Sequence, residues 1–324
     1  MSSAASASAA PDATRVVAVI VAYNRSELLR EAIEALLGQE RTVQAIVVVD
    51  NASTDDTAAV VATFGTAVDL VSLDRNTGGA GGFAVGMARA LQHHRPDWLW
   101  IMDDDTIPTA TALQALLVAV DGSDLVVAGS RVVWTDGQDH PMNTPRRKPF
   151  VSAAESEQAG SRGNLPVRST SFVSMFARAD VVREVGLPIA DYFIWNDDFE
   201  YSTRLLRGRR GVFVPGSVVV HKTKVLGSTD VDPGPRFYYE VRNKLWMLRH
   251  SQSLSGGEKL LYGASSVRRW IRTAARSSDR SVLGDGFRRG WRDGFSTRPR
   301  ANGDALAGFD GASADVVAVE RATA

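Results

Sequence analysis

Three consecutive carboxylates, Asp103, Asp104 and Asp105, directly follow an apolar run at residues 98–102. Like charges this close raise one another's pKa values and oppose folding, so a bound cation would relieve the cost. Mg²⁺ and Mn²⁺ prefer carboxylate oxygens together with substrate phosphates. Asp103 and Asp105 are therefore candidate ligands of a metal that neutralises a diphosphate. The alternative is an acidic loop that caps the helix expected after Pro108.

A second acidic pair, Asp197 and Asp198, lies between Trp195 and Glu200 at the expected start of a helix. The helix dipole stabilises negative charge there, so an ordinary helix N-terminus would have the same composition. In chemical terms, one carboxylate can serve as a general base for an attacking hydroxyl, which must lose its proton as the new bond forms. We assign that role to Asp198.

His221 ends an apolar run downstream of both acidic groups. An imidazole in this position can ligate a metal or contact a phosphate, whereas an isolated histidine is more often structural. We expect His221 to be functional because of the carboxylates upstream. The other histidines, His93, His94, His140 and His250, receive the structural interpretation.

Two further segments are candidates for binding an anionic or polar ligand. The run from Asn76 through Gly79 to Gly82 precedes a predicted helix, and its backbone N–H groups could approach an anion. A tight turn that packs strand against helix explains the run equally well, and it lacks the signature of a P-loop. Asp50 ends another apolar run, where its carboxylate could bond a nucleobase or ribose, whereas helix capping accounts for residues 53–56.

The elements that must position these residues alternate between strands and helices. Apolar, β-branched or aromatic runs predict buried strands at residues 16–21, 45–49, 68–73 and 98–102, and helices are predicted between them. This alternation predicts a doubly wound α/β fold. Ligands bind at the carboxyl ends of the strands in such folds, which here carry residues 23–25, 50–53 and 103–105.

Composition excludes several classes of function. A chain of 324 residues with 44% hydrophobic residues can bury a large core, and its net charge of +0 gives no global case for nucleic acid as a partner. The absence of cysteine excludes disulfides and thiolate chemistry and agrees with a reducing cytosol. No apolar run approaches the roughly 20 residues that a membrane-spanning helix needs.

The chain divides into four predicted regions. Residues 1–14 are small and polar, without the features of a signal peptide, and are expected to be a disordered tail. An α/β domain should occupy residues 15–235, with a mobile loop or lid near 134–164. Residues 236–300 read as a helical, basic and aromatic segment that either lies on an anionic membrane or packs onto the main domain. The Gly/Ala-rich residues 301–324 are expected to be a disordered tail.

Taken together, these motifs resemble the inverting family 2 glycosyltransferases of the GT-A type. Members place a strand-loop start, an Asp after the second strand, a DxD motif, a late acidic base and a histidine in this order. The resemblance covers about Val16 to Lys224 and implies a GT-A, Rossmann-like domain that binds a nucleotide-sugar. More narrowly, the glycine run, the aspartate triplet, the Trp195–Tyr201 string and His221 look like bacterial galactofuranosyltransferases of cell-wall galactan synthesis. Rhamnosyltransferases share much of this pattern.

The resemblance implies a role for each candidate residue. The metal, Mn²⁺ or Mg²⁺, would be held by Asp103, Asp105 and His221. The donor would be bound by Tyr23, Arg25, Asp50, Asn76, Gly79, Asp103 and Asp104. The acceptor would contact Trp195, Asp197 and Glu200, and Asp198 would be the catalytic base. The sequence departs from the galactofuranosyl pattern in having Asn196 before the carboxylate pair and in lacking an obvious large flanking β-domain.

The resulting expectation is a metal-dependent inverting hexosyltransferase. It would move galactofuranose from UDP-galactofuranose to a hydroxyl of a glycan or polyprenyl-linked glycan in cell-envelope polysaccharide synthesis. The alternatives are a rhamnosyltransferase that uses dTDP-rhamnose, a noncatalytic nucleotide-sugar-binding protein and a nucleotidyltransferase. We expect a cytoplasmic protein, with peripheral contact to the inner face of the cell membrane and no nucleic acid partner.

Overall fold

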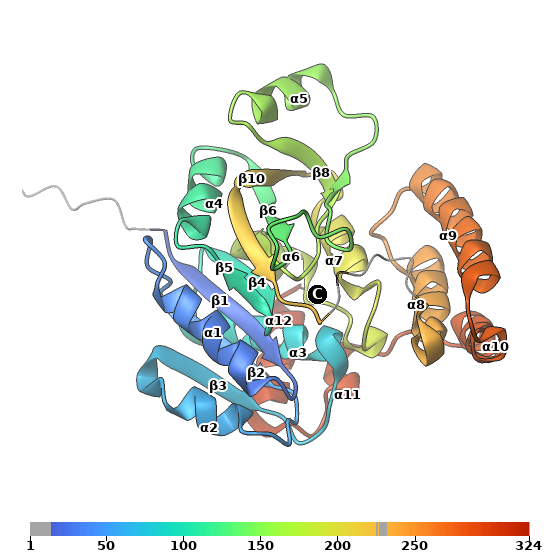
Figure 1. Cartoon of the computed structure of the whole chain (residues 1–324), viewed down its shortest axis with the longest axis horizontal. Coiled ribbons are helices and arrows are strands. Elements are labelled where there is room, and N and C mark those ends of the chain that lie inside the picture. Colours follow the sequence, from blue (N-terminus) through green and yellow to red (C-terminus); the bar gives the residue numbers. More distant parts are fainter. Residues whose placement is uncertain (1–13, 225, 227–231, 324) are drawn as a thin grey trace, which may run out of the picture.

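A mixed β-sheet forms the centre of the molecule in the computed structural model, which describes residues 14–224, 226 and 232–323 (Figure 1). The order of the described strands is β3-β2-β1-β4-β9-β6-β10-β8-β7, and β5 pairs with β10. The strands are β1 (Val16–Ala22), β2 (Ala45–Asp50), β3 (Val68–Ser72), β4 (Trp98–Asp103), β5 (Thr106–Pro108), β6 (Leu125–Val133), β7 (Arg146–Arg147), β8 (Leu165–Ser169), β9 (Met175–Arg178) and β10 (Arg210–His221).

Helices cover both faces of this sheet. Those of the first half and the middle are α1 (Ser26–Leu37), α2 (Thr57–Ala62), α3 (Gly78–Arg89), α4 (Ala112–Val120), α5 (Ala153–Gly160), α6 (Ala179–Val185) and α7 (Asp197–Leu205). Those of the C-terminal part are α8 (Phe237–His250), α9 (Gly256–Arg276), α10 (Arg280–Ser296), α11 (Asn302–Ala305) and α12 (Asp310–Thr323).

The four predicted strands, β1 to β4, form the parallel arrangement expected of a doubly wound fold. β1 is parallel to both β2 and β4, and β2 is parallel to β3, so their carboxyl ends meet at one edge of the sheet. Beyond β4 the sheet becomes mixed, because β9 runs antiparallel to both β4 and β6. The expected α/β fold class is confirmed, with a parallel half that gathers the candidate residues.

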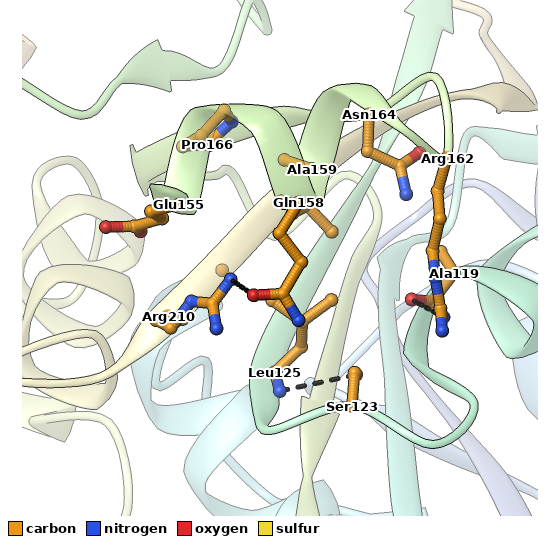
Figure 2. Close-up of a pocket in the computed structure, with 12 residues that line it drawn as sticks. Ala119, Ser123, Leu125, Glu155, Gln158, Ala159, Arg162, Asn164, Pro166 and Arg210 are labelled. Carbon is orange, nitrogen blue, oxygen red and sulfur yellow. Dashed lines mark hydrogen bonds between the residues drawn. The ribbon is translucent and has the colours of Figure 1, made fainter. Parts of the chain in front are cut away.

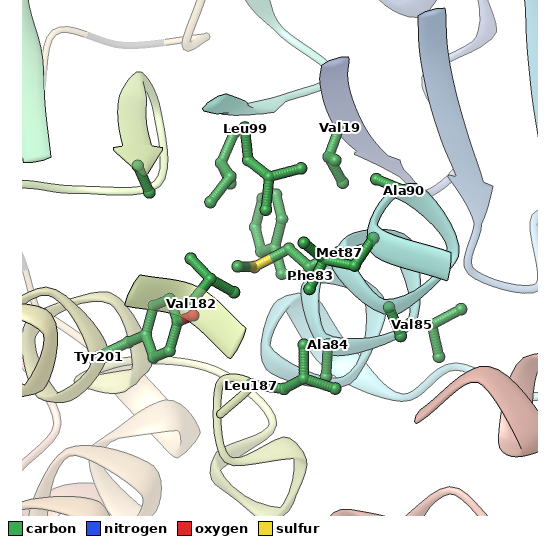
Figure 3. Packing of buried hydrophobic residues seen from close by; sticks show 14 of the residues in the cluster. Val19, Phe83, Ala84, Val85, Met87, Ala90, Leu99, Val182, Leu187 and Tyr201 are labelled. Atoms are coloured by element: carbon green, nitrogen blue, oxygen red, sulfur yellow. The ribbon is translucent and has the colours of Figure 1, made fainter. Parts of the chain in front are cut away.

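Strand β1 is buried on both faces, which explains its run without polar alternation. Val17, Val19 and Val21 belong to one core cluster with α3 and α12, whereas Ala18 and Ile20 belong to the other with α1 and α4. Figure 3 shows the first cluster, in which Val19, Leu99, Phe83, Met87, Val182, Leu187 and Tyr201 gather around α3.

The glycine run at the start of α3 has a packing role that can be measured. A Cβ atom added at Gly82 would lie 2.5 Å from Val21 Cγ1, so only glycine lets the helix approach β1 this closely. Gly78 has a φ of +70°, and a Cβ there would lie 2.0 Å from the carbonyl oxygen of Phe193. The run therefore sets the contact of α3 with the sheet and with the segment before α7.

The prediction that residues 301–324 are a disordered tail is wrong. Described residues 302–323 form α11 and α12, and Leu306, Phe309, Val316 and Val319 are buried in the cluster that contains α3. Composition misled the prediction, because alanine is the strongest helix former and small residues allow close helix packing. The predicted tail at residues 1–14 lies outside the described residues except for Thr14.

Residues 237–296 form three helices, in line with the predicted helical segment. α8, α9 and α10 group at one side of the molecule, at the right of Figure 1. Glycines on α10 allow it to pack closely on α8, since a Cβ at Gly290 would lie 2.7 Å from the carbonyl oxygen of Tyr238. None of the helices in the described residues has the length and apolar character needed to cross a membrane.

The second half contains one local difference from the sequence prediction and one irregular strand. The polar stretch at 134–164, expected as a loop or lid, contains β7 and α5, and α5 is capped by the Ser152 hydroxyl, which accepts from the Glu155 N–H. The two apolar runs flanking Pro215-Gly216 form one strand, β10, with a register shift between Val214 and Val218. The bulge allows the strand to continue through the proline.

Docking of α12 can be tested by a pair of valines on adjacent positions. Val316 is fully buried, whereas Val317 is only partly buried. Val316→Ala should lower the free energy of unfolding by about 2 kcal/mol, because it leaves a cavity against α3. Val317→Ala should cost less than about 1 kcal/mol, as measured by urea unfolding. Equal costs would contradict the docking of this helix.

Candidate active site

Strand pairing brings His221 next to the aspartate triplet. Asp103 is the last residue of β4, and β5 begins at Thr106, which pairs antiparallel with His221 at the end of β10. As a result, Asp103, Asp105 and His221 each offer a ligand atom, and these atoms lie within 4.8 Å of one another. Residues 118 positions apart in the sequence thus share one small site.

The geometry of this cluster fits a divalent cation. His221 Nε2 lies 3.1 Å from Asp105 Oδ1, and His221 Nδ1 lies 2.9 Å from the side-chain oxygen of Asn143. An outer partner of this kind orients metal-binding histidines. Asp103, Asp105 and His221 would together hold such a cation. Two carboxylates and an imidazole are a suitable donor set for Mn²⁺ or Mg²⁺.

Asp104 points to the first strand of the sheet instead. Its Oδ2 accepts from the Tyr23 N–H at 3.1 Å, and its Oδ1 lies 3.0 Å from Arg25 Nη1. The same guanidinium lies 2.5 Å from Asp105 Oδ2. Arg25, predicted to line the nucleotide pocket, is thus also the counter-ion of the triplet. Tyr23 is 45% exposed beside it, so its ring is accessible.

Burial makes the charge on the triplet costly. It raises the pKa of Asp103 to about 7, with a further rise from Asp105, and raises the pKa of Asp104 to about 6 although Arg25 opposes that rise. Burial also acts on Asp105, but its contacts with His221 and Arg25 outweigh it and lower the pKa. A cation at this site would stabilise the ionised form of all three groups.

The second acidic pair lies close to the first. Gly79 at the start of α3 faces Asp197, since a Cβ there would lie 3.9 Å from Asp197 Oδ2. Burial raises the pKa of Asp197 well above its ordinary value, and the charges of Asp198 and Asp103 raise it further. The charge of Asp103 thus contributes to the raised pKa of Asp197.

The loop that carries this pair has an unusual backbone. Phe193, Trp195 and Asn196 all have positive φ values, of 63°, 69° and 63°, which are costly for residues other than glycine. Asn243 on α8 holds the loop by donating through its side-chain nitrogen to the carbonyls of Tyr192, Ile194 and Trp195 at 2.8, 3.0 and 2.8 Å. Strain of this kind persists only where surrounding contacts impose it.

Asp198 occupies a different environment from Asp197. It is partly accessible, and burial raises its pKa, while the Phe199 N–H and the cations Arg146 and Lys244 oppose the rise. Lys244 is itself buried, and burial lowers its pKa to about 7. A carboxylate with a raised pKa that remains accessible can accept a proton from a substrate hydroxyl near neutral pH.

The predicted acceptor contact of Glu200 is wrong. Its side chain is 1% exposed, and its carboxylate is engaged by Arg204 at 3.0 Å and by the Ser251 hydroxyl at 2.6 Å. Glu200 lies two positions after Asp198 on α7, and positions two apart lie on nearly opposite sides of a helix. Its side chain therefore faces the interior. Its role is to tie α7 to the segment after α8.

The remaining donor candidates lie at the strand ends. Asp50 is buried at the end of β2, and its Oδ1 accepts from the Ser53 N–H at 2.9 Å. Asn76 caps the turn before α3, where its side-chain oxygen accepts from the Gly78 N–H at 2.7 Å. Asn51 braces the same turn by donating to the Gly78 carbonyl and accepting from the Thr77 N–H.

Four supporting residues escaped the sequence analysis: Asn51, Asn143, Asn243 and Lys244. Each acts through contacts between distant parts of the chain, such as the 78-residue separation of Asn143 from His221. Asn51 directly follows Asp50, and this position at a strand end was a usable signal. The buried Lys244 and Asn243 on α8 had no comparable signal, because a polar pair in an amphipathic helix normally faces solvent.

A small hollow between α4, α5 and β10 lies apart from these carboxylates (Figure 2). Arg162 and Arg210 border it, and Arg210 donates to Gln158 at 2.7 Å. Its volume of about 20 Å³ holds about one water molecule, so it cannot accommodate a sugar or nucleotide. The strand-end carboxylates are the better candidate for an active site.

An α/β sheet with acidic side chains gathered at its strand ends is typical of enzymes that transfer sugars from nucleotide-sugars. Comparison with known sequences identifies the class. The chain belongs to glycosyl transferase family 2, whose family model matches residues 17–184. It is therefore a glycosyltransferase enzyme, and the predicted resemblance to this family is confirmed.

Among individual proteins, the chain is similar to galactofuranosyltransferase GlfT1 of Mycolicibacterium smegmatis, with 31% identity over 198 residues, 59% of this chain and 65% of that protein. GlfT1 of Mycobacterium tuberculosis matches at 31% identity over 59% of this chain and 64% of its own length. The chain thus spans just under two thirds of these curated relatives. Succinoglycan biosynthesis protein ExoO of Rhizobium meliloti is 36% identical over 41% of this chain and 37% of that protein.

Solved structures agree on the fold. The S. aureus TarS fragment 1–349 in complex with UDP-GlcNAc superposes with a TM-score of 0.62 at 13% identity, covering 96% of this chain and 90% of that one. GalNAc-T7 with UDP, GalNAc and Mn²⁺ gives a TM-score of 0.61 at 14% identity, covering 88% and 55%. At this level of identity the likeness supports the GT-A type of fold alone.

The loop before α7 provides a test of how the site is held. Asn243→Ala should lower the free energy of unfolding by about 2 kcal/mol, since the buried side-chain amide that donates its two hydrogens to the carbonyls of residues 192, 194 and 195 is lost. Amide hydrogen exchange at residues 192–196 should become faster. Ser266→Ala, which removes a buried hydroxyl on α9, should leave exchange in this loop unchanged. Unchanged exchange in the Asn243 variant would show that α8 does not impose the loop conformation.

Proposed function

We propose that this chain is a metal-dependent, inverting glycosyltransferase that uses a UDP-sugar, with UDP-galactofuranose as the donor. The acceptor is a hydroxyl of a glycan or polyprenyl-linked glycan in the synthesis of a cell-envelope polysaccharide. Support for the sugar comes from the similarity to two mycobacterial GlfT1 proteins. Support for the pathway comes from these relatives and from ExoO, a succinoglycan biosynthesis protein.

The single observation that carries the proposal is the proximity of two acidic sites with different functions. Asp103, Asp105 and His221 offer ligand atoms within 4.8 Å of one another that could hold a cation, and the start of α3 contacts Asp197, the neighbour of Asp198, at Gly79. A nucleotide-sugar donor needs a site for its diphosphate, and an attacking hydroxyl needs a base. These two requirements correspond to the two acidic sites.

The divalent cation, when bound by Asp103, Asp105 and His221, supplies charge that stabilises the departing nucleoside diphosphate. Arg25 adds positive charge beside the triplet. Tyr23 and Asp50 bind the nucleoside from the ends of β1 and β2, and Asn76 and Gly79 border the sugar from the start of α3.

Asp198 removes the proton from the acceptor hydroxyl as that oxygen attacks the anomeric carbon. Attack from the face opposite the diphosphate inverts the anomeric configuration. Trp195 and Asp197 position the acceptor in this scheme, and the braced loop before α7 restricts their motion. Buried Lys244 near Asp198 opposes the rise of the pKa that burial imposes, which keeps the base ionised over a wider pH range.

Asp198→Asn tests the base and Asp105→Asn tests the metal site. The first variant should lower kcat by at least 100-fold and leave the affinity for UDP in Mn²⁺ unchanged, because general-base catalysis contributes this much. The second should weaken binding of UDP in Mn²⁺ and show little further loss in EDTA. Calorimetry measures the binding, and release of nucleoside diphosphate measures turnover.

The donor is identified by screening UDP- and dTDP-sugars for metal-dependent release of the nucleoside diphosphate. Preference for UDP-galactofuranose supports the proposal, whereas preference for dTDP-rhamnose replaces the donor. Release of pyrophosphate would indicate a nucleotidyltransferase, and binding without release would indicate a noncatalytic protein. Unchanged kcat in the Asp198→Asn variant would contradict its role as the base.

We further propose that α9 and α10 contact an anionic membrane surface and so bring the enzyme to a lipid-linked acceptor in the cytoplasm. An exposed apolar stripe on α9 contains Leu260, Val267 and Ile271, which are 78%, 49% and 65% exposed. Exposed basic residues, Arg268 and Arg272, lie beside the stripe. An apolar face with basic flanks is typical of helices that lie in the membrane interface.

Flotation with vesicles that contain anionic phosphatidylglycerol tests this contact. The unaltered chain should float, and the double variant Leu260→Asp/Ile271→Asp should lose at least tenfold in bound fraction, because charge opposes insertion of the stripe. Val118→Asp on α4, a valine that is 57% exposed on another surface, is the matched control and should float normally. Equal flotation of the stripe variant would contradict a role for α9.

A further inference from the structure

A second cavity lies between the start of α3, the loop before α7 and the C-terminal segment. Its volume is about 270 Å³, the space of about nine water molecules at liquid density. Three arginines, Arg75, Arg242 and Arg300, line the cavity together with the aromatic residues Phe193 and Tyr239. The rings of these two aromatic residues stack with centroids 5.3 Å apart. The active-site residues assigned above do not account for the three arginines.

Among the described residues that line the cavity, cations outnumber carboxylates. Asp191 is the only carboxylate among its described lining residues, and it pairs with Arg300, whose Nη2 lies 2.6 Å from Asp191 Oδ1. Three guanidinium groups and one carboxylate leave two positive charges in excess. Asp304 also acts electrostatically on Arg300 from outside the lining, and Asp74 lies 3.7 Å from Arg75 on the exposed surface.

Contacts with the protein hold the arginines in place. Arg242 Nη2 donates to the carbonyl of Asp191 at 2.7 Å, and its guanidinium lies 4.1 Å from the ring of Trp246. Arg75 Nη2 donates to the carbonyl of Ala307 at 2.8 Å, and its guanidinium lies 3.9 Å from the ring of Phe309. Groups that are already ordered lose little entropy when they bind a ligand.

Donor capacity remains after these contacts. A guanidinium carries five N–H donors, and Arg300 uses Nε and Nη2 for Asp191. Arg300 Nη1 donates to none of the residues that the structure describes. The backbone N–H groups of Thr77 and Gly78 already donate to Asn51 and Asn76. The arginines, and not the helix start, are therefore the groups able to bind an anion.

We propose that this cavity binds a phosphate or diphosphate group, separately from the metal site that holds the donor diphosphate. Arginine matches the tetrahedral oxygens of phosphate in paired hydrogen bonds, and the cavity is large enough for two phosphate units. In the described part of the chain, the ion pairs of the aspartate triplet involve Arg25 and His221 and none of these three arginines.

The position of the cavity next to the loop before α7 suggests that its ligand is part of the acceptor. This extension of the proposal rests on the proposed function. Asp191 and Phe193 border it, and the chain then runs directly through the braced loop to Asp197 and Asp198. A diphosphate that links a glycan to a lipid has the required charge, and so does free pyrophosphate or phosphate. Both sources share the chemistry that the arginines would bind.

Titration of the full chain with inorganic pyrophosphate in EDTA tests the site, because EDTA removes the cation that the triplet needs. The double variant Arg75→Gln/Arg300→Gln should bind pyrophosphate at least tenfold more weakly. Arg75→Lys/Arg300→Lys should recover part of the affinity. Arg162→Gln/Arg210→Gln, which alters the small hollow of Figure 2, should bind normally. Unchanged affinity in the Arg75→Gln/Arg300→Gln variant, with or without a lower melting temperature, would overturn the proposal and leave the arginines a purely structural role.

Two acceptors distinguish the sources of the anion: a glycan linked through diphosphate to a lipid, and the same glycan on a neutral alkyl chain. If the cavity binds the acceptor, the glutamine variant should raise KM at least tenfold for the first and leave it unchanged for the second. If it binds a free anion, both KM values should stay unchanged while pyrophosphate binding is lost. Binding of UDP in Mn²⁺ reports whether the variant is folded. Failure of every variant and of the unaltered chain to transfer sugar would contradict the proposed function, and the pyrophosphate titration would still decide the cavity.

Discussion

The burial of three adjacent carboxylates at the end of β4 is the constraint on which the site depends. Burial and mutual repulsion raise the pKa of Asp103 to about 7 and that of Asp104 to about 6, so the protein must supply positive charge to keep them ionised. Arg25, in the loop that follows β1, provides it through its guanidinium, and the pairing of β5 with β10 brings His221 into contact with Asp105. The site thus requires strands from both halves of the sheet.

Much of the parallel half of the sheet could be predicted because its signals are local. A buried strand of β-branched residues and the polar residues that end it are contiguous in sequence, so β1, β2 and β4 and their terminal groups were identified together. The proximity of Asp105 and His221 came from resemblance and not from the pattern, since pairing across 116 residues has no local signature. The roles of Asp103, Asp105, His221 and Asp198 remain predictions that their positions support.

The errors arose where tertiary contacts decide the outcome. Glu200 was placed with the acceptor because it lies near Asp198 in sequence, yet helix geometry turns it toward Arg204. Residues 301–324 were judged by composition, although Val316 and Val319 lie three positions apart, which is the spacing of a buried helix face. The i,i+4 spacing of Glu200 and Arg204 was a local signal for their ion pair, whereas the α3 residues that cover Val316 and Val319 lie far along the chain.

The family model covers one part of the candidate site and not the other. The family model ends at residue 184, so it covers Arg25, Asp50 and the triplet but not Asp198, His221 or Asn243. The strained loop before α7 is held by Asn243 of α8, and the arginine cavity is completed by Arg300, Ala305 and Leu306, which lie in or next to α11. If the acceptor binds on this side, as we propose, differences in acceptor among related enzymes should arise in these C-terminal elements, which lie beyond the part of the chain that the family model matches.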